Sequence, residues 1–227
     1  MLQNSVYFGV LISLGSYVIG MYLKRKTGWG FMNPLLISII LVIACLLITG
    51  VSYEEYNADA NWLSYLLTPA TICLAVPLYQ QVELLKKNYK AIISGIAASV
   101  LSSLLTVLVL ALLFNFDHAT YATFLPKSIT TAIGMGVSEE LGGFVSITVV
   151  VIIISGVLGN IFAEKFLSLL KIDEPIAKGI AIGSASHAIG TAKAMEMGTI
   201  EGATSGLSIV VSGILTVIGA SLFAMFM

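Results

Sequence analysis

Residues 183–198, GSASHAIGTAKAMEMG, place hydroxyls, a histidine and a lysine between strongly apolar neighbours. Ser184, His187 and Thr191 stand at i, i+3 and i+7, so a continuous helix would present all three on one face. A histidine inside an apolar span is a candidate for taking up and releasing a proton near neutral pH. The hydroxyls beside it could bind the oxygen atoms of a small polar solute. The pattern therefore predicts a polar site within an apolar helix.

The next face of the same helix would hold Ser186, Gly190 and Lys193. Lys193 lies three residues before Glu196, close enough on a helix for the two side chains to pair. Other interpretations stay open at this point. Small residues often serve only the close packing of membrane helices. His187 could simply tie two helices together, and Lys193 could extend its ammonium to water at a membrane face.

A second polar segment, residues 124–141, holds Lys127, Ser128, Thr130 and Thr131 ahead of a glycine-rich stretch. These groups are available to the same site, and the two threonines are expected to bind substrate oxygens. The segment is polar for a membrane helix, so we expect it to be interrupted.

A third segment, residues 63–80, contains Pro69 and Pro77. Each proline removes a helix hydrogen bond and clashes with the preceding turn, which predicts a helix kinked or broken near its middle. Freed backbone groups around Pro69, Thr71 and Pro77 would then complete a binding site. Broken helix ends with exposed N–H groups favour an anion.

The composition indicates a lipid environment for these segments. Of 227 residues, 58% are hydrophobic and 10% are charged, and the mean hydropathy is +1.00, far from the composition of a soluble domain. A net charge of −1 offers no basic field for nucleic acid. Cys45 and Cys73 lie within apolar runs and form no metal-ligand pattern. With no soluble-enzyme motif, we expect neither an enzyme nor a cofactor, and we predict an all-α polytopic membrane protein.

Eight apolar segments can be read along the chain: 4–23, 33–50, 63–80, 91–114, 124–141, 146–163, 177–197 and 204–226. The second is opened by Asn33-Pro34, which suits a helix start. No basic region precedes the first segment, so we expect it to remain as a transmembrane helix rather than a cleaved signal peptide.

Lysine and arginine mark the cytoplasmic loops. This rule places loops 24–26, 86–90 and 164–178 inside. Loops 52–62 and 115–123 are then outside. It follows that segment 124–141 is re-entrant, which leaves about seven transmembrane helices, with the N-terminus outside and the C-terminus inside.

The two halves of the chain align at an offset near 113 residues, for example Ala75-Val76-Pro77 with Ala188-Ile189-Gly190. The sign of the charge bias reverses between corresponding loops, as the basic cluster 24–26 and the acidic pair Glu139-Glu140 illustrate. Reversed bias indicates reversed orientation. The sequence thus predicts a single membrane domain built from an inverted-topology repeat with discontinuous helices, about 1–114 and 115–227, an architecture common in carriers. A chance alignment between apolar helices is the alternative.

At these residues the chain resembles the LrgB/CidB family of bacterial membrane proteins, which has a plastid relative that translocates glycolate and glycerate. The stretches TPATICLAVPLYQQ, LPKSITTAIG and AIGSASHAIGTAKAMEMGTIEGATSGL carry the resemblance, which extends from the first span to residue 217. One departure lies in segment 124–141. The family pattern continues TTP-I-A, whereas this chain has Thr131-Ala132-Ile133-Gly134, so we expect the break there to rest on Gly134 and Gly136.

The resemblance implies two functions. Bacterial members are named as holin-like or antiholin-like modulators of murein hydrolase export, autolysis and programmed cell death. Other members are linked to pyruvate uptake. The resemblance also implies the bacterial plasma membrane as the location and a small LrgA/CidA-type membrane protein as a partner.

The residues themselves favour a carrier, since a holin-like pore gives no reason for interrupted helices at corresponding positions in two halves. We expect alternating access in a homodimer, coupled to protons, with a small monocarboxylate such as pyruvate, glycolate or glycerate as substrate. An intramembrane enzyme is the third and weakest interpretation, because no base with an orienting partner can be recognised. The candidate substrate-binding residues are Ser184, Ser186, His187, Thr191, Lys193, Thr130, Thr131, Pro69, Thr71 and Pro77.

Overall fold

The computed structural model describes residues 7–28 and 32–227, and within these ranges the chain forms helices and turns without a strand. Its contacts divide it into two compact units, residues 1–73 and 74–227. The boundary falls inside α4, Leu67–Gln80. The repeat boundary near residue 114 stays a prediction. The prediction of an all-helical chain is confirmed.

The first unit contains α1 (Phe8–Thr27), α2 (Pro34–Thr49), α3 (Tyr53–Ala60) and the 3₁₀-helix η2 (Asn61–Leu66). The predicted helix start at Asn33-Pro34 is confirmed: the Asn33 side chain accepts the Leu35 and Leu36 N–H groups, at 2.9 and 3.2 Å. Residues 52–62, which we expected to form a loop, are helical instead. Ser52 and Glu55 cap each other's backbone at the start of α3, and such a capping box starts a helix even in a polar stretch.

Helix α4 is continuous from Leu67 to Gln80, so a break near its middle is absent, while a kink, the other form that we expected, stays a prediction. Pro69 stands in the first turn, where its missing N–H has no helical partner to lose. Pro77 lies inside the helix, but α4 ends only three residues later. The irregular part precedes the prolines, where η2 passes directly into α4.

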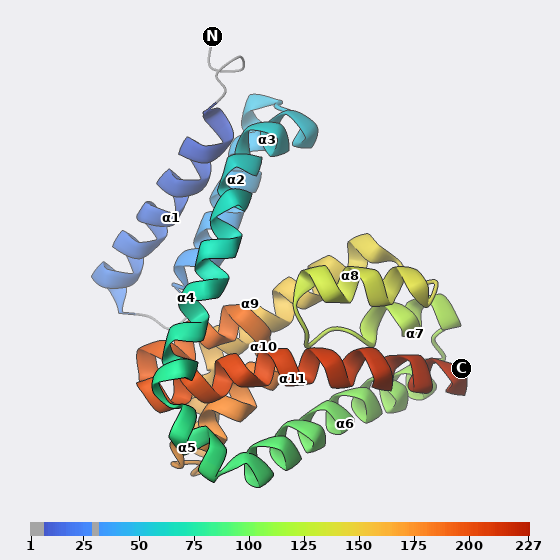
Figure 1. Cartoon of the computed structure of the whole chain (residues 1–227). Helices are drawn as coiled ribbons and strands as arrows, with labels where there is room; N and C mark the ends of the chain where they lie inside the picture. Colours follow the sequence, from blue (N-terminus) through green and yellow to red (C-terminus); the bar gives the residue numbers. More distant parts are fainter. Residues whose placement is uncertain (1–6, 29–31) are drawn as a thin grey trace. The chain divides into compact units, whose positions relative to one another are not determined.

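The second unit is built from α5 (Val82–Lys87), α6 (Tyr89–Phe114), α7 (His118–Phe124), α8 (Thr131–Glu140), α9 (Val145–Leu169), α10 (Pro175–Met197), α11 (Thr199–Phe223) and the 3₁₀-helix η3 (Ala224–Phe226) (Figure 1). The predicted loops 86–90 and 115–123 therefore contain short helices. Among the described residues, three helices are long and apolar enough to cross a membrane: α6, α9 and the stretch Thr199–Phe226.

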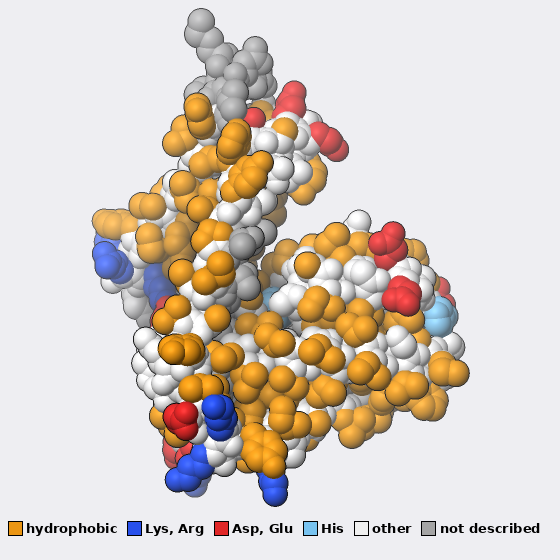
Figure 2. Space-filling model, in the orientation of Figure 1, with side chains coloured by type: hydrophobic (Ala, Val, Ile, Leu, Met, Phe, Trp, Pro, Cys, Tyr) orange, Lys and Arg blue, Asp and Glu red, His pale blue; other side chains and the backbone are white. Residues whose placement is uncertain are grey.

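Exposed apolar side chains cover the flanks of these three helices. Leu113 on α6 is 68% exposed and Ile214 on α11 is 59% exposed. Figure 2 shows hydrophobic side chains spread over the face formed by α6 and α11, with lysines gathered near α5. An apolar flank of this extent on a soluble surface would be exceptional. Together with the apolar helices, it identifies a membrane protein.

Helices α7 and α8 form a hairpin whose two outer ends meet. The His118 ring lies at the start of α7, and its Nε2 is 3.1 Å from the carbonyl oxygen of Leu141, at the end of α8. The turn between the helices spans residues 125–130. The expected interruption of this segment is therefore present, but Gly134 and Gly136 lie inside α8 and do not make it. The hairpin is compatible with the predicted re-entrant path.

Helix α10 also folds back on itself, at His187. The backbone there has φ 42° and ψ −140°, which interrupts the helix between a first arm, 175–186, and a second arm, 188–197. A Cβ atom at Gly190 would lie 3.3 Å from the carbonyl oxygen of Ile182, a contact that a straight helix cannot make. The arms pack on each other, since Ile182 and Ala194 share one apolar cluster with Leu167 of α9.

This fold-back changes the predicted course of the chain. Asn88 and Glu174 line one pocket, so the lysine-bearing loops 86–90 and 164–178 lie at the same end of the unit, as expected. The His118 Nδ1 atom lies 2.8 Å from the backbone oxygen of Met227, which places the end of the chain beside loop 115–123. The prediction put these two on opposite faces. It is wrong because segment 177–197 turns back instead of crossing.

Candidate functional site

The tips of the two hairpins approach each other from opposite ends of the second unit. Ser128, at the tip of α7–α8, has its Oγ 3.2 Å from the Oγ of Ser103, midway along α6. Ser186, at the tip of α10, lines a pocket together with Ser99, one turn earlier on α6. Residues four apart on a helix are neighbours on one face. The two interrupted segments therefore bring their polar tips to the same level of α6.

Helix α9 contacts both tips through one residue, Ile152. Its carbonyl oxygen is 3.0 Å from Nε2 of His187. Its side chain lies so close to Gly134 of α8 that a Cβ atom there would collide with it. The site is thus a polar region enclosed by two hairpins, α6 and α9, at the middle of α6 and about a third of the way along α9.

His187 is buried, with 3% of its surface exposed, and it is one of three non-glycine residues with positive φ among those described. The left-handed half of φ is unfavourable for a residue with a Cβ. The predicted interruption of this segment is therefore confirmed, but a histidine and not a glycine makes it. Because its acceptor is a backbone carbonyl, Nε2 carries a proton; this tautomer is assigned from the hydrogen bond.

Two glycines of α9 make room for the α10 tip. A Cβ atom at Gly156 would lie 2.8 Å from the His187 ring, and one at Gly159 would overlap the Oγ of Ser186. One residue further on, the Nδ2 of Asn160 donates to the carbonyl oxygen of Ile189 at 2.8 Å. Asn160 therefore holds the first turn of the second arm. Sequence reasoning missed all three residues, although a Gly-x-x-Gly-Asn pattern within an apolar helix was visible.

Thr191 is fully buried and joins α10 to α11. Its hydroxyl donates to the His187 carbonyl at 2.9 Å and lies 2.7 Å from the Oγ of Ser205. The predicted common face of Ser184, His187 and Thr191 is wrong, because the chain reverses at His187 and puts Ser184 and Thr191 on different arms.

Other buried hydroxyls escaped prediction because they lie in a helix that looked uniformly apolar. In α11, Ser208 donates to the Thr204 carbonyl and Ser212 to the Ser208 carbonyl. These bonds satisfy each hydroxyl within its own helix, which is how polar side chains are tolerated inside a membrane.

The Ser184 hydroxyl differs from these. The residue is 3% exposed, and its Oγ has no hydrogen-bond partner in the part of the chain that the structure describes. A buried hydroxyl without a partner is unfavourable. It is the kind of group that a bound polar molecule would satisfy.

Thr130 and Thr131 stand at the start of α8. Thr130 occupies the N-cap position with extended backbone, yet its side chain makes no capping hydrogen bond. Lys127 lies within the turn between α7 and α8 and is half-buried. Its Nζ donates to the Oγ of Ser128 at 3.0 Å.

The proline segment does not join the tips within one unit. Pro69 belongs to the first unit and Pro77 to the second, and the side chain of Thr71 lies outside the described residues. Their role as substrate ligands stays a prediction.

Lys193 lies at the far end of the second arm, away from the tips. Its Nζ is 2.9 Å from Glu164 Oε2 on α9 and 3.4 Å from Glu196 Oε2, so the predicted pairing with Glu196 is confirmed. A polar pocket of about 440 Å³ adjoins this ion pair and is also lined by Lys178 and Glu201. Because Lys193 is already paired, its predicted contact with substrate has no support from its position.

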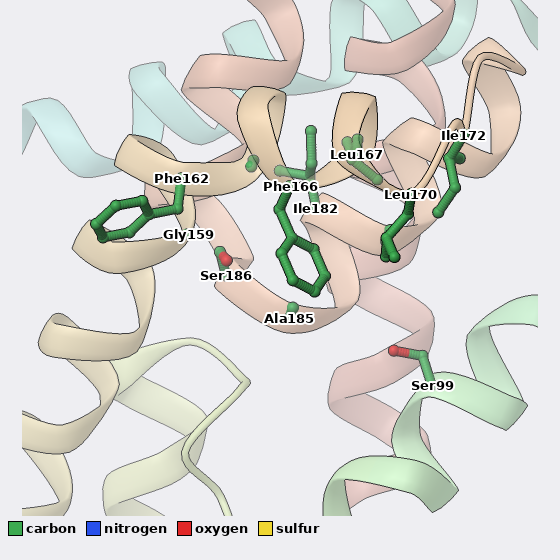
Figure 3. Close-up of a pocket in the computed structure, with 12 residues that line it drawn as sticks. Ser99, Gly159, Phe162, Phe166, Leu167, Leu170, Ile172, Ile182, Ala185 and Ser186 are labelled. Carbon is green, nitrogen blue, oxygen red and sulfur yellow. The ribbon is translucent and has the colours of Figure 1, made fainter. Parts of the chain in front are cut away.

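A second pocket, of about 330 Å³, lies between α9 and the first arm of α10. Figure 3 shows Phe166 and Leu170 lining it, with Ser186 on α10 and Ser99 on α6. The lining is otherwise apolar. The pocket reaches the α10 tip and offers two hydroxyls, one from Ser186 on α10 and one from Ser99 on α6.

Comparison with known proteins agrees with the resemblance. The LrgB-like family matches residues 13–226. Antiholin-like protein LrgB of Bacillus cereus (strain B4264) is 37% identical over 221 residues, covering 97% of this chain and 96% of that protein. The protein of the same name from Bacillus anthracis (strain CDC 684 / NRRL 3495) has the same identity and coverage. No solved structure matches the chain. The chain belongs to the LrgB-like family of membrane proteins.

Proposed function

We propose that this chain is a membrane carrier for small monocarboxylates that works by alternating access. The observation that supports this is the meeting of two interrupted helical segments from opposite ends of one unit, at Ser103 and Ile152. Irregular backbone at membrane depth is tolerated where it lines a cavity or is buried in protein. In carriers, such paired interruptions surround the substrate near the bilayer midplane.

The electrostatics of the tips favour an anion. Helix α8 begins at Thr131 and the second arm of α10 begins after His187, so two helix N-termini face the same region. Helix N-termini carry unpaired N–H groups and partial positive charge. A carboxylate is the simplest small solute that satisfies both.

The hydroxyls supply the remaining contacts. Ser184, Ser186, Thr130 and Thr131 would bind the 2-oxo or 2-hydroxy oxygen and the carboxylate, and Thr191 would hold the α10 tip. With Nε2 donating to Ile152, His187 would take up a coupling proton at Nδ1. In this proposal the protein acts in the bacterial plasma membrane as a homodimer, with an LrgA/CidA-type protein as a partner.

The second candidate function is that of an antiholin-like modulator of murein hydrolase activity and cell lysis. The comparisons favour it over a specific carboxylate carrier, since both relatives described above bear the name antiholin-like. The two functions are compatible if carboxylate flux controls lysis. The carrier is the one that the tip geometry supports.

Purified protein in proteoliposomes distinguishes the candidates. A carrier gives saturable uptake of labelled pyruvate, glycolate or glycerate, enhanced by an inward proton gradient, while an entrapped dye such as carboxyfluorescein is retained. A pore releases the dye and shows no saturation. Protein that gives neither uptake nor leakage, but delays lysis in cells that express a holin, would establish the antiholin function and overturn the carrier.

A further inference from the structure

Lys127 places a positive charge at mid-depth. It lies in the tip of the α7–α8 hairpin, next to Ser128, whose hydroxyl contacts Ser103 of α6. Ser103 is 14 residues from Tyr89 and 11 from Phe114, the two ends of α6. At about 1.5 Å per residue these spans are roughly 21 and 16 Å, and a lysine side chain is far shorter than either. Lys127 therefore cannot extend its ammonium group along the helix to water.

Among the described residues, no carboxylate forms a salt bridge with this lysine, since both salt bridges found there belong to Lys193. Within the same part of the chain, the ammonium of Lys127 donates to the hydroxyl of Ser128, a neutral group. The acids of the hairpin are Asp117, at the start of α7, and Glu139 and Glu140, at the end of α8, so all three stand at the opposite end of the hairpin from its tip. Ionisable groups inside a membrane normally have partners of opposite charge or backbone acceptors.

The helix that follows adds positive potential at the same place. Thr130 is of the residue type that caps helices, but its hydroxyl does not cap α8. The first N–H groups of α8 thus receive no cap from Thr130, which stands three residues after Lys127. On the other tip, Ser184 keeps a buried hydroxyl that has no partner among the described residues. Cation, uncapped N–H groups and spare hydroxyl are together suited to one small anion.

We propose that Lys127 is the counter-charge of the transported anion and binds its carboxylate directly, together with the N-terminus of α8. The inference rests on the proposed carrier function and adds a residue that selects for charge. The ammonium balances the charge of one carboxylate, so a monocarboxylate fits and a neutral analogue of the same shape does not. It also assigns the hydroxyls of the α10 tip to the 2-oxo or 2-hydroxy group.

The test compares Lys127→Gln and Lys127→Arg with wild type by measuring the uptake of labelled glycolate into proteoliposomes. Lys165→Gln is the matched control, because Lys165 is an exposed lysine near the end of α9. We expect Lys127→Gln to raise the KM for glycolate roughly 10- to 100-fold, the usual effect of losing a charge-assisted hydrogen bond. Lys127→Arg should retain most of the affinity, and Lys165→Gln should behave as wild type.

A neutral competitor separates charge selection from a structural role. Glycolamide should compete poorly with glycolate in wild type, and the difference between the two competitors should shrink in Lys127→Gln. Thermal unfolding in detergent, with and without glycolate, shows whether each variant is folded and whether ligand raises its Tm. If folded Lys127→Gln keeps the wild-type KM and selectivity, the inference is wrong while the carrier stands. If wild type itself shows no saturable uptake and no ligand-induced rise in Tm, the proposed carrier function is wrong, whatever the variants do.

Discussion

The imidazole Nε2 of His187 lies 3.0 Å from the carbonyl oxygen of Ile152, and this contact fixes the tip of the α10 hairpin to the first half of α9. The same residue reverses the chain with positive φ. Backbone reversal and side-chain contact therefore depend on one position, and the two can be separated by substitution.

Replacing His187 by glycine and by alanine should give different stabilities. Both changes remove the imidazole, but alanine keeps a Cβ at φ 42° and glycine does not. We expect the free energy of unfolding to be about 1–2 kcal/mol higher for His187→Gly than for His187→Ala. The difference is read as a higher Tm in detergent. Both variants should lose the pH dependence of uptake. Equal Tm values for the two would mean that the chain does not reverse at this residue.

Gly159→Ala should displace the α10 tip. Its new methyl group would overlap the Ser186 side chain, and overpacking of this kind costs about 1–3 kcal/mol. Gly136→Ala is the matched control, since a Cβ there meets nothing within 4 Å. The double variant Gly159→Ala/Ser186→Gly should recover most of the Tm. A double variant no more stable than Gly159→Ala would show that the two residues do not touch.

The course of the chain can be tested with single cysteines in a background that lacks Cys45 and Cys73. Cysteines at Asp173 and Glu196 should be labelled from the same side of the membrane, because α10 returns to the end from which it starts. Cysteines at Glu140 and Met227 should both be labelled from the other side. Labelling of positions 173 and 196 from opposite sides would restore the complete crossing that the hydropathy pattern suggested.

The ion pair of Lys193 and Glu164 should contribute little to stability. Glu164 is 63% exposed in its side chain, and exposed pairs are worth about 0–1 kcal/mol. We expect Lys193→Gln and Glu164→Gln to lower Tm slightly and equally at low salt and not at all in 1 M salt. Should Lys193→Gln alone raise the KM for substrate, Lys193 would contact substrate as the sequence pattern first suggested.

The helical class and the positions of the long helices were predictable, because runs of apolar residues and the Asn33-Pro34 start act locally. The interruption of segment 177–197 was also predictable from its polarity and glycines. Its form was not. Hydropathy measures how apolar a segment is, and a hairpin of two short arms is as long and as apolar as one complete span.

The residue at which the chain reverses could not be predicted for a related reason. His187 was chosen for its proton chemistry, and nothing in its type indicates positive φ, which tertiary contacts with Gly156 and Ile152 impose. Likewise, Lys193 looked like a site residue because it lies six residues from His187. Its partner Glu164 is distant in sequence, so the ion pair appears only in the fold.

Ile152 gives α9 a mechanical role. Its carbonyl oxygen binds the α10 tip, and its side chain lies against Gly134 of α8. A screw displacement of α9 by one residue, about 1.5 Å along its axis with a rotation of about 100°, would release both contacts at once. The two hairpins are thus coupled through one helix, and in the proposed carrier a change of access would displace α9 and both hairpins together rather than one hairpin alone.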